Sequence, residues 1–112
     1  SRRDSMSTKL GEKLRDLRKK KGFTLEQLAE MAGMSKSYLW ELENRESLRP
    51  SADKLAALGD ALGVAYTFFT EDDVREPEER HTDEAFYRNY QKLDSESKER
   101  LRKILETFQP KK

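Results

Sequence analysis

The chain has 112 residues, of which 40% are charged and 34% are hydrophobic, and its formal net charge is +1. This composition excludes a large apolar core, and no apolar run approaches the roughly 20 residues that a membrane-spanning helix needs. Because the chain contains no cysteine, disulfides and thiolate metal sites are excluded, and we expect a cytoplasmic protein without membrane contact.

Residues 1–7 precede the first predicted helix. The letters "SRRDS" stand before Met6, and two interpretations are open. Residues 1–5 are a cloning scar if Met6 is the start. Otherwise, residues 1–7 form a flexible basic arm.

A first helix is predicted after Ser7 or Thr8, either of which can cap its N-terminus. Its apolar residues recur at spacings of four and three, as on one face of a helix. They are Leu10, Leu14 and Leu17. The run "RKKKG" ends the helix, because cations favour the C-terminal end of the dipole and Gly22 suits the left-handed position that follows.

The segment "TLEQLAEMAGMSKSYLWELENR" predicts two short helices joined by a turn. The letters "TLEQ" are a capping-box pattern, so the second helix begins at about Leu25. Gly33 takes the turn, because glycine enters the left-handed region without steric cost. Ser35 then caps a third helix, which covers residues 36 to about 44.

Two more helices complete residues 8–70. Pro50 blocks continuation of the third helix, and Ser51 caps a fourth helix that Gly63 closes. The letters "VAYTFFTE" predict a short fifth helix. No stretch alternates as a strand, so we expect an all-α bundle of five helices.

Residues 71–82 are rich in acidic residues and contain Pro77, which predicts a solvated linker. Two amphipathic helices are expected within residues 83–109. The first starts at Thr82 or Asp83, and the second starts at Asp94 or Ser95.

Two capped helices joined by a glycine turn form a helix-turn-helix. The letters "LRDLRKKKGFTLEQLAEMAGMSKSYLWELENR", followed by "RPSADKLAALGDALGV", resemble the DNA-binding domain of the Cro/XRE (phage-repressor-like) regulators. The resemblance covers residues 9–70 and implies a five-helix bundle that binds a double-stranded DNA operator. It also implies a sequence-specific transcriptional regulator, and a repressor rather than an activator.

In this family the early residues of the third helix enter the major groove, which implies base contacts from Lys36, Ser37 and Glu41. Lysine can donate to guanine, serine can donate or accept, and glutamate can accept from cytosine N4. Each has an alternative: a phosphate contact for Lys36, mere tolerance of the groove for Ser37, and a solvated or ion-paired carboxylate for Glu41. Contacts to phosphate are implied for Thr24, Tyr38, Asn44, Arg45 and Arg49. Arg45 and Arg49 could equally be solvated loop charges.

The family commonly joins the positions of Arg18 and Glu43 by a salt bridge, so we interpret this pair as structural. Trp40 departs from the small or polar residue that the family often has at its position. Its ring packs over Lys36 and Asn44, or it contacts DNA backbone or a neighbouring subunit.

No catalytic arrangement, cofactor or metal site is predicted. His81 stands alone in the acidic segment and is interpreted as a solvated histidine. There is no cysteine, no phosphate-binding glycine loop and no cluster of metal ligands.

The two C-terminal helices are too short to fold alone and must bury their apolar faces against something. We expect a homodimer, because a single helix-turn-helix contacts few bases and a two-fold dimer contacts two half-sites. The expected interface is Phe86, Tyr90, Leu93, Leu101, Ile104, Leu105 and Phe108. The alternative is a protein-interaction module, such as an antitoxin or an antirepressor-controlled partner, in which these helices bind a regulatory protein and DNA binding serves autoregulation.

Overall fold

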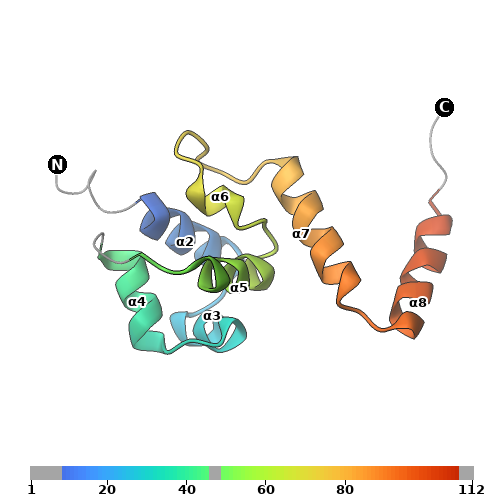
Figure 1. Cartoon of the computed structure of the whole chain (residues 1–112), viewed down its shortest axis with the longest axis horizontal. Coiled ribbons are helices and arrows are strands. Elements are labelled where there is room, and N and C mark those ends of the chain that lie inside the picture. Colours follow the sequence, from blue (N-terminus) through green and yellow to red (C-terminus); the bar gives the residue numbers. More distant parts are fainter. Residues whose placement is uncertain (1–8, 46–48, 109–112) are drawn as a thin grey trace.

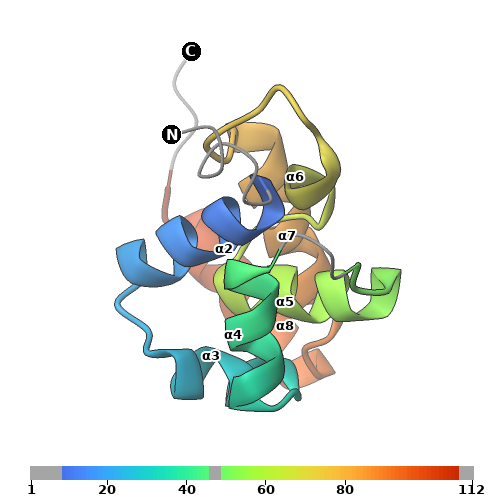
Figure 2. The ribbon, with the colours of Figure 1, turned by 90° about the vertical axis from the view of Figure 1, so that its left-hand side faces the viewer.

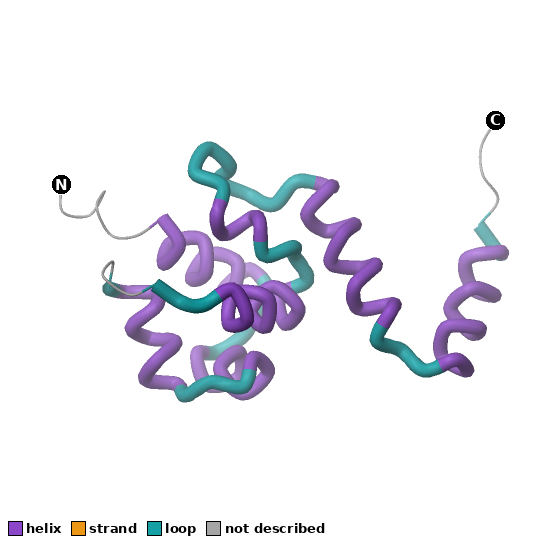
Figure 3. Tube along the Cα trace, in the orientation of Figure 1, coloured by secondary structure: helices purple, strands orange, loops and turns teal. Residues whose placement is uncertain are grey.

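The computed structural model describes residues 9–45 and 49–108. Within these ranges the chain consists of helices and the loops between them, and no strand is present (Figure 3). The expected all-α fold is therefore confirmed. The proposed caps Ser7 and Thr8, and the arm formed by residues 1–7, lie outside the described residues.

Five helices form one compact bundle, which we call the front bundle (Figure 1). They are α2 (Lys9–Lys20), α3 (Leu25–Ala32), α4 (Lys36–Asn44), α5 (Ala52–Leu62) and the single turn α6 (Thr67–Thr70). Helices α2 and α3 both pack against α4, and α3 also packs against α5. The helix order and the caps of α3, α4 and α5 agree with the predictions made from sequence.

Local chemistry explains the turn between α3 and α4. The Thr24 hydroxyl accepts from the Gln27 amide, while the Gln27 side chain accepts from the Thr24 amide, which completes the capping box. Gly33 ends α3 in the left-handed region at φ 73°. The Ser35 hydroxyl accepts from the Tyr38 amide and starts α4.

The inner side of α4 packs against a core that all five helices of the front bundle form. The side chains of this core are those of Leu14, Leu17, Leu28, Leu39, Leu42, Leu55, Leu58, Leu62, Val64, Phe68 and Phe69, with Ala29. Gly11 allows α2 to pack closely against the end of α4. Any residue with a Cβ atom would place that atom 2.5 Å from the Glu43 carbonyl oxygen, which is too close. The side of α4 that faces away from this core is thereby left as an exposed surface (Figure 2).

The C-terminal helices are α7 (Glu79–Gln91) and α8 (Ser95–Glu106). The start of α8 agrees with expectation, because the Asp94 side chain accepts from the Ser97 amide. The predicted start of α7 at Thr82 or Asp83 is wrong. Glu78 is its N-cap, in a capping box with His81, so helix begins where residues 71–82 were expected to remain a linker.

The interpretation of His81 as a solvated histidine is also wrong, because only 1% of its surface is exposed. Its Nδ1 accepts from the Glu78 amide at 2.9 Å, and its Nε2 lies 3.1 Å from a Glu71 carboxylate oxygen. The acidic composition suggested full solvation, but each of these polar groups has a specific partner. The segment is a folded connection between α6 and α7.

Helix α8 projects away from the rest of the molecule (Figure 1). None of its residues is buried. The radius of gyration is 16.2 Å, compared with about 13 Å for a compact chain of similar length. Among the described residues, no helix combines the length and the apolar character needed to cross a membrane.

Candidate nucleic-acid interface

Helix α4 lies at the surface of the front bundle, at the end of the molecule opposite α8 (Figures 1 and 2). Leu39 and Leu42 anchor it in the core with 0% and 1% of their surfaces exposed. The proposed base-contacting residues occupy its other side. Lys36 and Ser37 are exposed, and Glu41, one turn beyond Ser37, is half-buried. These three side chains offer a cation, a hydroxyl and a carboxylate on neighbouring turns of one helix.

Trp40 lies on the same helix and is 45% exposed. The Arg45 guanidinium sits 6.0 Å from the centre of its ring, which is the outer range of a cation–π contact. The partner that the structure provides is therefore Arg45, which was not among the expected ones. An exposed indole beside an arginine provides a flat apolar surface and a positive charge at the C-terminal end of α4.

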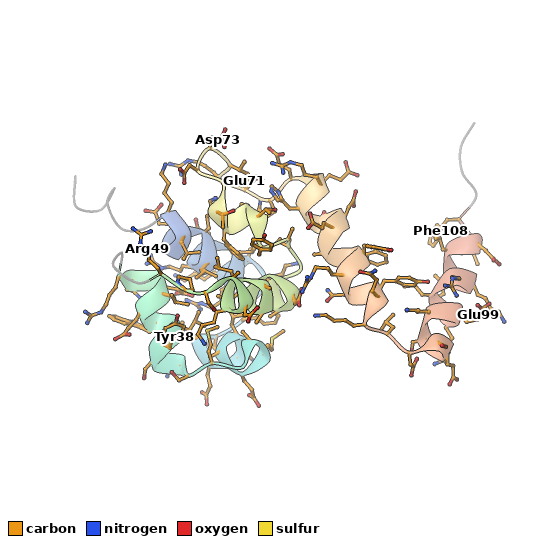
Figure 4. All side chains as sticks on the ribbon, in the orientation of Figure 1. Tyr38, Arg49, Glu71, Asp73, Glu99 and Phe108 are labelled. Atoms are coloured by element: carbon orange, nitrogen blue, oxygen red, sulfur yellow. The ribbon has the colours of Figure 1, made fainter. Side chains whose placement is uncertain are left out.

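The proposed phosphate contacts are distributed around α4. Thr24 is exposed at the N-terminus of α3, while Tyr38 is half-buried and has the Lys54 ammonium 5.4 Å from its ring centre. Arg49 is exposed just before α5 (Figure 4). Lys54 adds a cation beside Tyr38, and local sequence patterns gave no signal for this contact between α5 and α4.

Asn44 is engaged within the protein. Its side-chain amide donates to the Trp40 carbonyl at 2.8 Å, and its oxygen accepts from Arg15 at 3.4 Å. Arg15 also donates to the Glu43 carbonyl at 3.2 Å. The bond from Arg15 to Glu43 satisfies one of the carbonyl groups at the end of α4 that helix geometry leaves without partners. Sequence alone gave no signal for Arg15.

Arg18 and Glu43 form the expected ion pair. Arg18 Nε donates to one carboxylate oxygen at 2.7 Å and Nη2 donates to the other at 3.0 Å. The side chains are 11% and 2% exposed. The hydrogen bonds to Glu43 raise the pKa of Arg18 above its usual value. The remaining guanidinium nitrogen, Nη1, donates to the Phe23 carbonyl at 3.0 Å. The Arg18 side chain therefore connects α2, the α2–α3 loop and α4.

A second surface lies far from α4, between α7 and α8. An apolar groove there contains six of the seven residues expected at a dimer interface, together with Tyr87 and Arg102. The six are Phe86, Tyr90, Leu101, Ile104, Leu105 and Phe108. Leu93 is not part of the groove lining and lies in the turn between the helices, 40% exposed.

Tyr87 was missed, although its three-residue spacing from Tyr90 was a usable signal. The two rings stack with their centres 6.4 Å apart. Lys98 and Arg102 of α8 approach the Tyr90 ring at 5.5 and 5.8 Å. Phe108, labelled in Figure 4, is 70% exposed at the end of this surface. The described residues include no group of three or more histidine, cysteine or acidic side chains that could hold a metal ion.

Comparisons with known proteins agree with this geometry. A family model described as a helix-turn-helix domain matches residues 9–67. The chain is 37% identical over 68 residues to the HTH-type transcriptional regulator SinR of Bacillus licheniformis, covering 60% of this chain and 61% of that protein. It is 33% identical over 98 residues to the immunity repressor protein of Bacillus phage phi105, covering 87% of this chain and 65% of the repressor. The chain thus spans less than two thirds of either relative.

Solved structures show the same similarity. The N-terminal DNA-binding domain of SinR from Bacillus subtilis is 34% identical with a TM-score of 0.53, covering 55% of this chain and 93% of that one. SinR in complex with DNA is also 34% identical with a TM-score of 0.53, covering 55% and 98%. The SinR protein/SinI protein complex matches at 28% identity and a TM-score of 0.53, covering 91% of this chain and 84% of that one. With a family model that spans more than half of its length and relatives that carry the same fold, the chain belongs to the helix-turn-helix family of Cro/XRE regulators.

Proposed function

We propose that this protein is a sequence-specific, double-stranded DNA-binding transcriptional regulator, and a repressor, that binds a two-half-site operator as a homodimer. The observation that carries the proposal is the exposed outer side of α4, whose inner side is fixed by the core and by the Arg18–Glu43 pair. The similarity to SinR, which has been solved in complex with DNA, supports it.

The two kinds of DNA contact come from different parts of this surface. Lys36, Ser37 and Glu41 carry the donors and acceptors that distinguish base edges in the major groove. Tyr38 and Asn44 belong to α4, Arg45 is its C-cap, and Thr24 and Arg49 lie in neighbouring segments of the chain. These five residues position the protein on the phosphates. Asn44 also holds the end of α4, so its contribution combines DNA contact with local structure.

The homodimer is supported by the unburied C-terminal helices. Phe86, Ile104 and Leu105 are 61%, 56% and 67% exposed, which is costly for apolar side chains in water. A second copy offers the same groove, and a two-fold arrangement lets each copy cover the other. Two front bundles would then address two half-sites about one helical turn apart.

Selection of bound sites from a pool of random duplexes tests the proposal. A folded, pure protein should enrich one motif with two related halves, and its binding should weaken steeply with salt because phosphate contacts release counterions. Failure to enrich any motif, with the helical circular dichroism spectrum intact, would show that the protein is not a sequence-specific regulator.

A second candidate function concerns the same groove. The similarity to the SinR protein/SinI protein complex extends over 91% of this chain and so includes the C-terminal helices. In this alternative, the groove binds a different regulatory protein. Light scattering of the pure chain separates the two: a dimer at micromolar concentration favours self-association, whereas a monomer that still binds a half-site leaves the groove for another protein.

A further inference from the structure

His81 joins the C-terminal helices to the front bundle. Its backbone carbonyl accepts from the Ala65 amide at 2.9 Å, and its ring meets the Phe68 ring edge-on at 5.5 Å. Because Nδ1 accepts from the Glu78 amide, the ring proton lies on Nε2 and is donated to Glu71. Each polar atom of this buried side chain is thus tied to a specific neighbour.

Glu71 contacts both α7 and the front bundle. Arg80 of α7 donates to its two carboxylate oxygens at 2.7 and 3.1 Å. Lys13 of α2, 7% exposed, donates to the backbone carbonyls of Phe68 and Glu71, and its ammonium lies 4.6 Å from the Phe68 ring centre. The start of α7 is therefore connected through Glu71 to α6 and α2.

A second anchor lies two turns along α7. Arg88 donates to both carboxylate oxygens of Asp60 on α5, at 3.1 and 3.2 Å, and Lys92 also donates to Asp60. Burial alone would raise the pKa of Asp60, but these hydrogen bonds lower it below the usual value. His81 and Arg88 are seven residues apart, or about 10 Å along the helix axis. Two anchors at this separation fix the direction of α7 as well as its position.

The residues that attach α7 and those that form the groove lie on opposite sides of the helix. With about 3.6 residues per turn, the positions of His81, Ala85, Arg88 and Lys92 fall on one side. Phe86 and Tyr90 fall on the other side and line the groove. Figure 1 shows the result: α7 stands between the front bundle and α8.

We propose that the anchors at His81 and Asp60 make α7 a rigid strut that sets the separation between the two DNA-reading helices of a dimer, and thereby the operator spacing that the protein accepts. This inference rests on the proposed function, because it requires α7 and α8 to pair two copies on DNA. His81, Glu71, Asp60 and Arg88 act as positioning residues: they select operators without touching them.

The physical consequence is a narrow spacing preference. Each base pair inserted between half-sites moves the second one by about 3.4 Å and rotates it by about 35° around the duplex axis. A flexible connection absorbs such changes, whereas a rigid strut leaves one α4 out of register with its groove.

Operators that differ only in the number of base pairs between two identical half-sites test this directly. The wild-type protein should bind one spacing best and lose about tenfold or more at two base pairs longer or shorter. His81→Ala and the surface variant Arg88→Ala should each flatten this profile to within about threefold while keeping the dimer mass. Thr82→Ala, an exposed neighbour of His81, is the matched control and should retain the sharp profile.

The outcomes separate this inference from the proposed function. Equal binding at all spacings by a dimeric wild type would overturn the strut alone. A sharp profile in folded Arg88→Ala and His81→Ala would overturn it as well. Absence of any motif, or a monomeric chain, would overturn the proposed function and the strut with it.

A measurement without DNA reports on the strut itself. The absence of native cysteine allows spin labels at Lys19→Cys on α2 and Gln91→Cys on α7, diluted with unlabelled protein so that one chain is measured. The labelled protein should give a narrow distance distribution that broadens clearly when Arg88→Ala is added and stays narrow with Thr82→Ala. A broad distribution in the otherwise unchanged protein would contradict a rigid strut.

Discussion

The front bundle buries most of its large apolar side chains, whereas the C-terminal helices leave most of theirs exposed. Of the buried apolar side chains among the described residues, all but Ala85 belong to the front bundle and its loops. Helix α8 buries none, and its Ile104 and Leu105 are more than half exposed. Both regions have regular, capped helices.

Helix formation and burial are therefore separate requirements. Short helices gain most of their stability from packing of an apolar face. The front bundle satisfies this requirement within one chain, so it can present polar residues of α4 to solvent. The α7–α8 groove does not satisfy it, which is why we assign the groove to a second copy.

The largest effect on the front bundle should come from its buried ion pair. Removing one partner leaves an uncompensated buried charge, so Glu43→Ala should lower the free energy of unfolding by about 3–5 kcal/mol. DNA binding should fall with it, although Glu43 faces Arg18 and not solvent. Urea unfolding followed by circular dichroism measures the change.

The exposed pair in α8 is the matched control. Arg102 and Glu99 are 57% and 58% exposed and 3.5 Å apart. Glu99→Ala should change stability by no more than about 0.5 kcal/mol. Equal losses for Glu43→Ala and Glu99→Ala would remove the distinction between the buried ion pair of the front bundle and the exposed ion pair of α8.

Smaller changes in DNA-binding free energy should distinguish the base contacts of α4 from its phosphate contacts. Lys36→Ala should cost about 1–3 kcal/mol of discrimination at one base position of each half-site. Arg45→Ala should weaken all sites alike and reduce the salt slope by about 0.9. Binding titrations on a panel of single-base operator variants, at several salt concentrations, measure both.

Arg100, an exposed cation on α8, provides the control for the Lys36 and Arg45 substitutions. Arg100→Ala removes the same charge from exposed α8 and should leave base preference and salt slope unchanged. If Lys36→Ala lowers affinity equally on every operator variant, Lys36 is a phosphate contact.

The smallest expected effect is the pH dependence of stability that Glu71 contributes at acidic pH. Hydrogen bonds from Arg80 and His81 lower the pKa of Glu71 to about 2 from the ordinary 4.5. A carboxyl group with a lowered folded-state pKa stabilises the protein above its unfolded pKa, and this contribution is lost as pH falls through the folded value. The stability gap between wild type and Glu71→Gln should therefore narrow progressively from about pH 4.5 towards 2. Thr82→Ala changes no charge, and its gap should stay constant; a Glu71→Gln gap equally independent of pH would contradict the Glu71 interaction.

Local signals were sufficient to predict the front bundle. Capping patterns at Thr24, Ser35 and Ser51, and glycines at the helix ends, each act over a few residues. The Arg18–Glu43 pair followed from the family resemblance. These features depend on contacts that neighbouring residues or a shared motif specify.

The connection to α7 could not be predicted in this way. His81 is buried by Phe68 and Glu71, and Arg88 is held by Asp60, which is 28 residues away. An acidic segment with one proline has the composition of a solvated linker. Its actual structure depends on tertiary contacts, and the same holds for the bonds of Arg15 and Lys13 to distant carbonyl groups.

The most direct test compares two duplexes, one with two half-sites and one with a single half-site. Wild type should prefer the first by about 100-fold or more, since in the proposed dimer the paired α7–α8 grooves link two front bundles. Leu101→Asp combined with Leu105→Asp should give a helical monomer that binds both duplexes alike with unchanged base preference, while Lys103→Asp, on the other side of α8, should behave as wild type. A double variant that remains dimeric and keeps the two-half-site preference would contradict the assignment of reading to α4 and pairing to the α7–α8 groove.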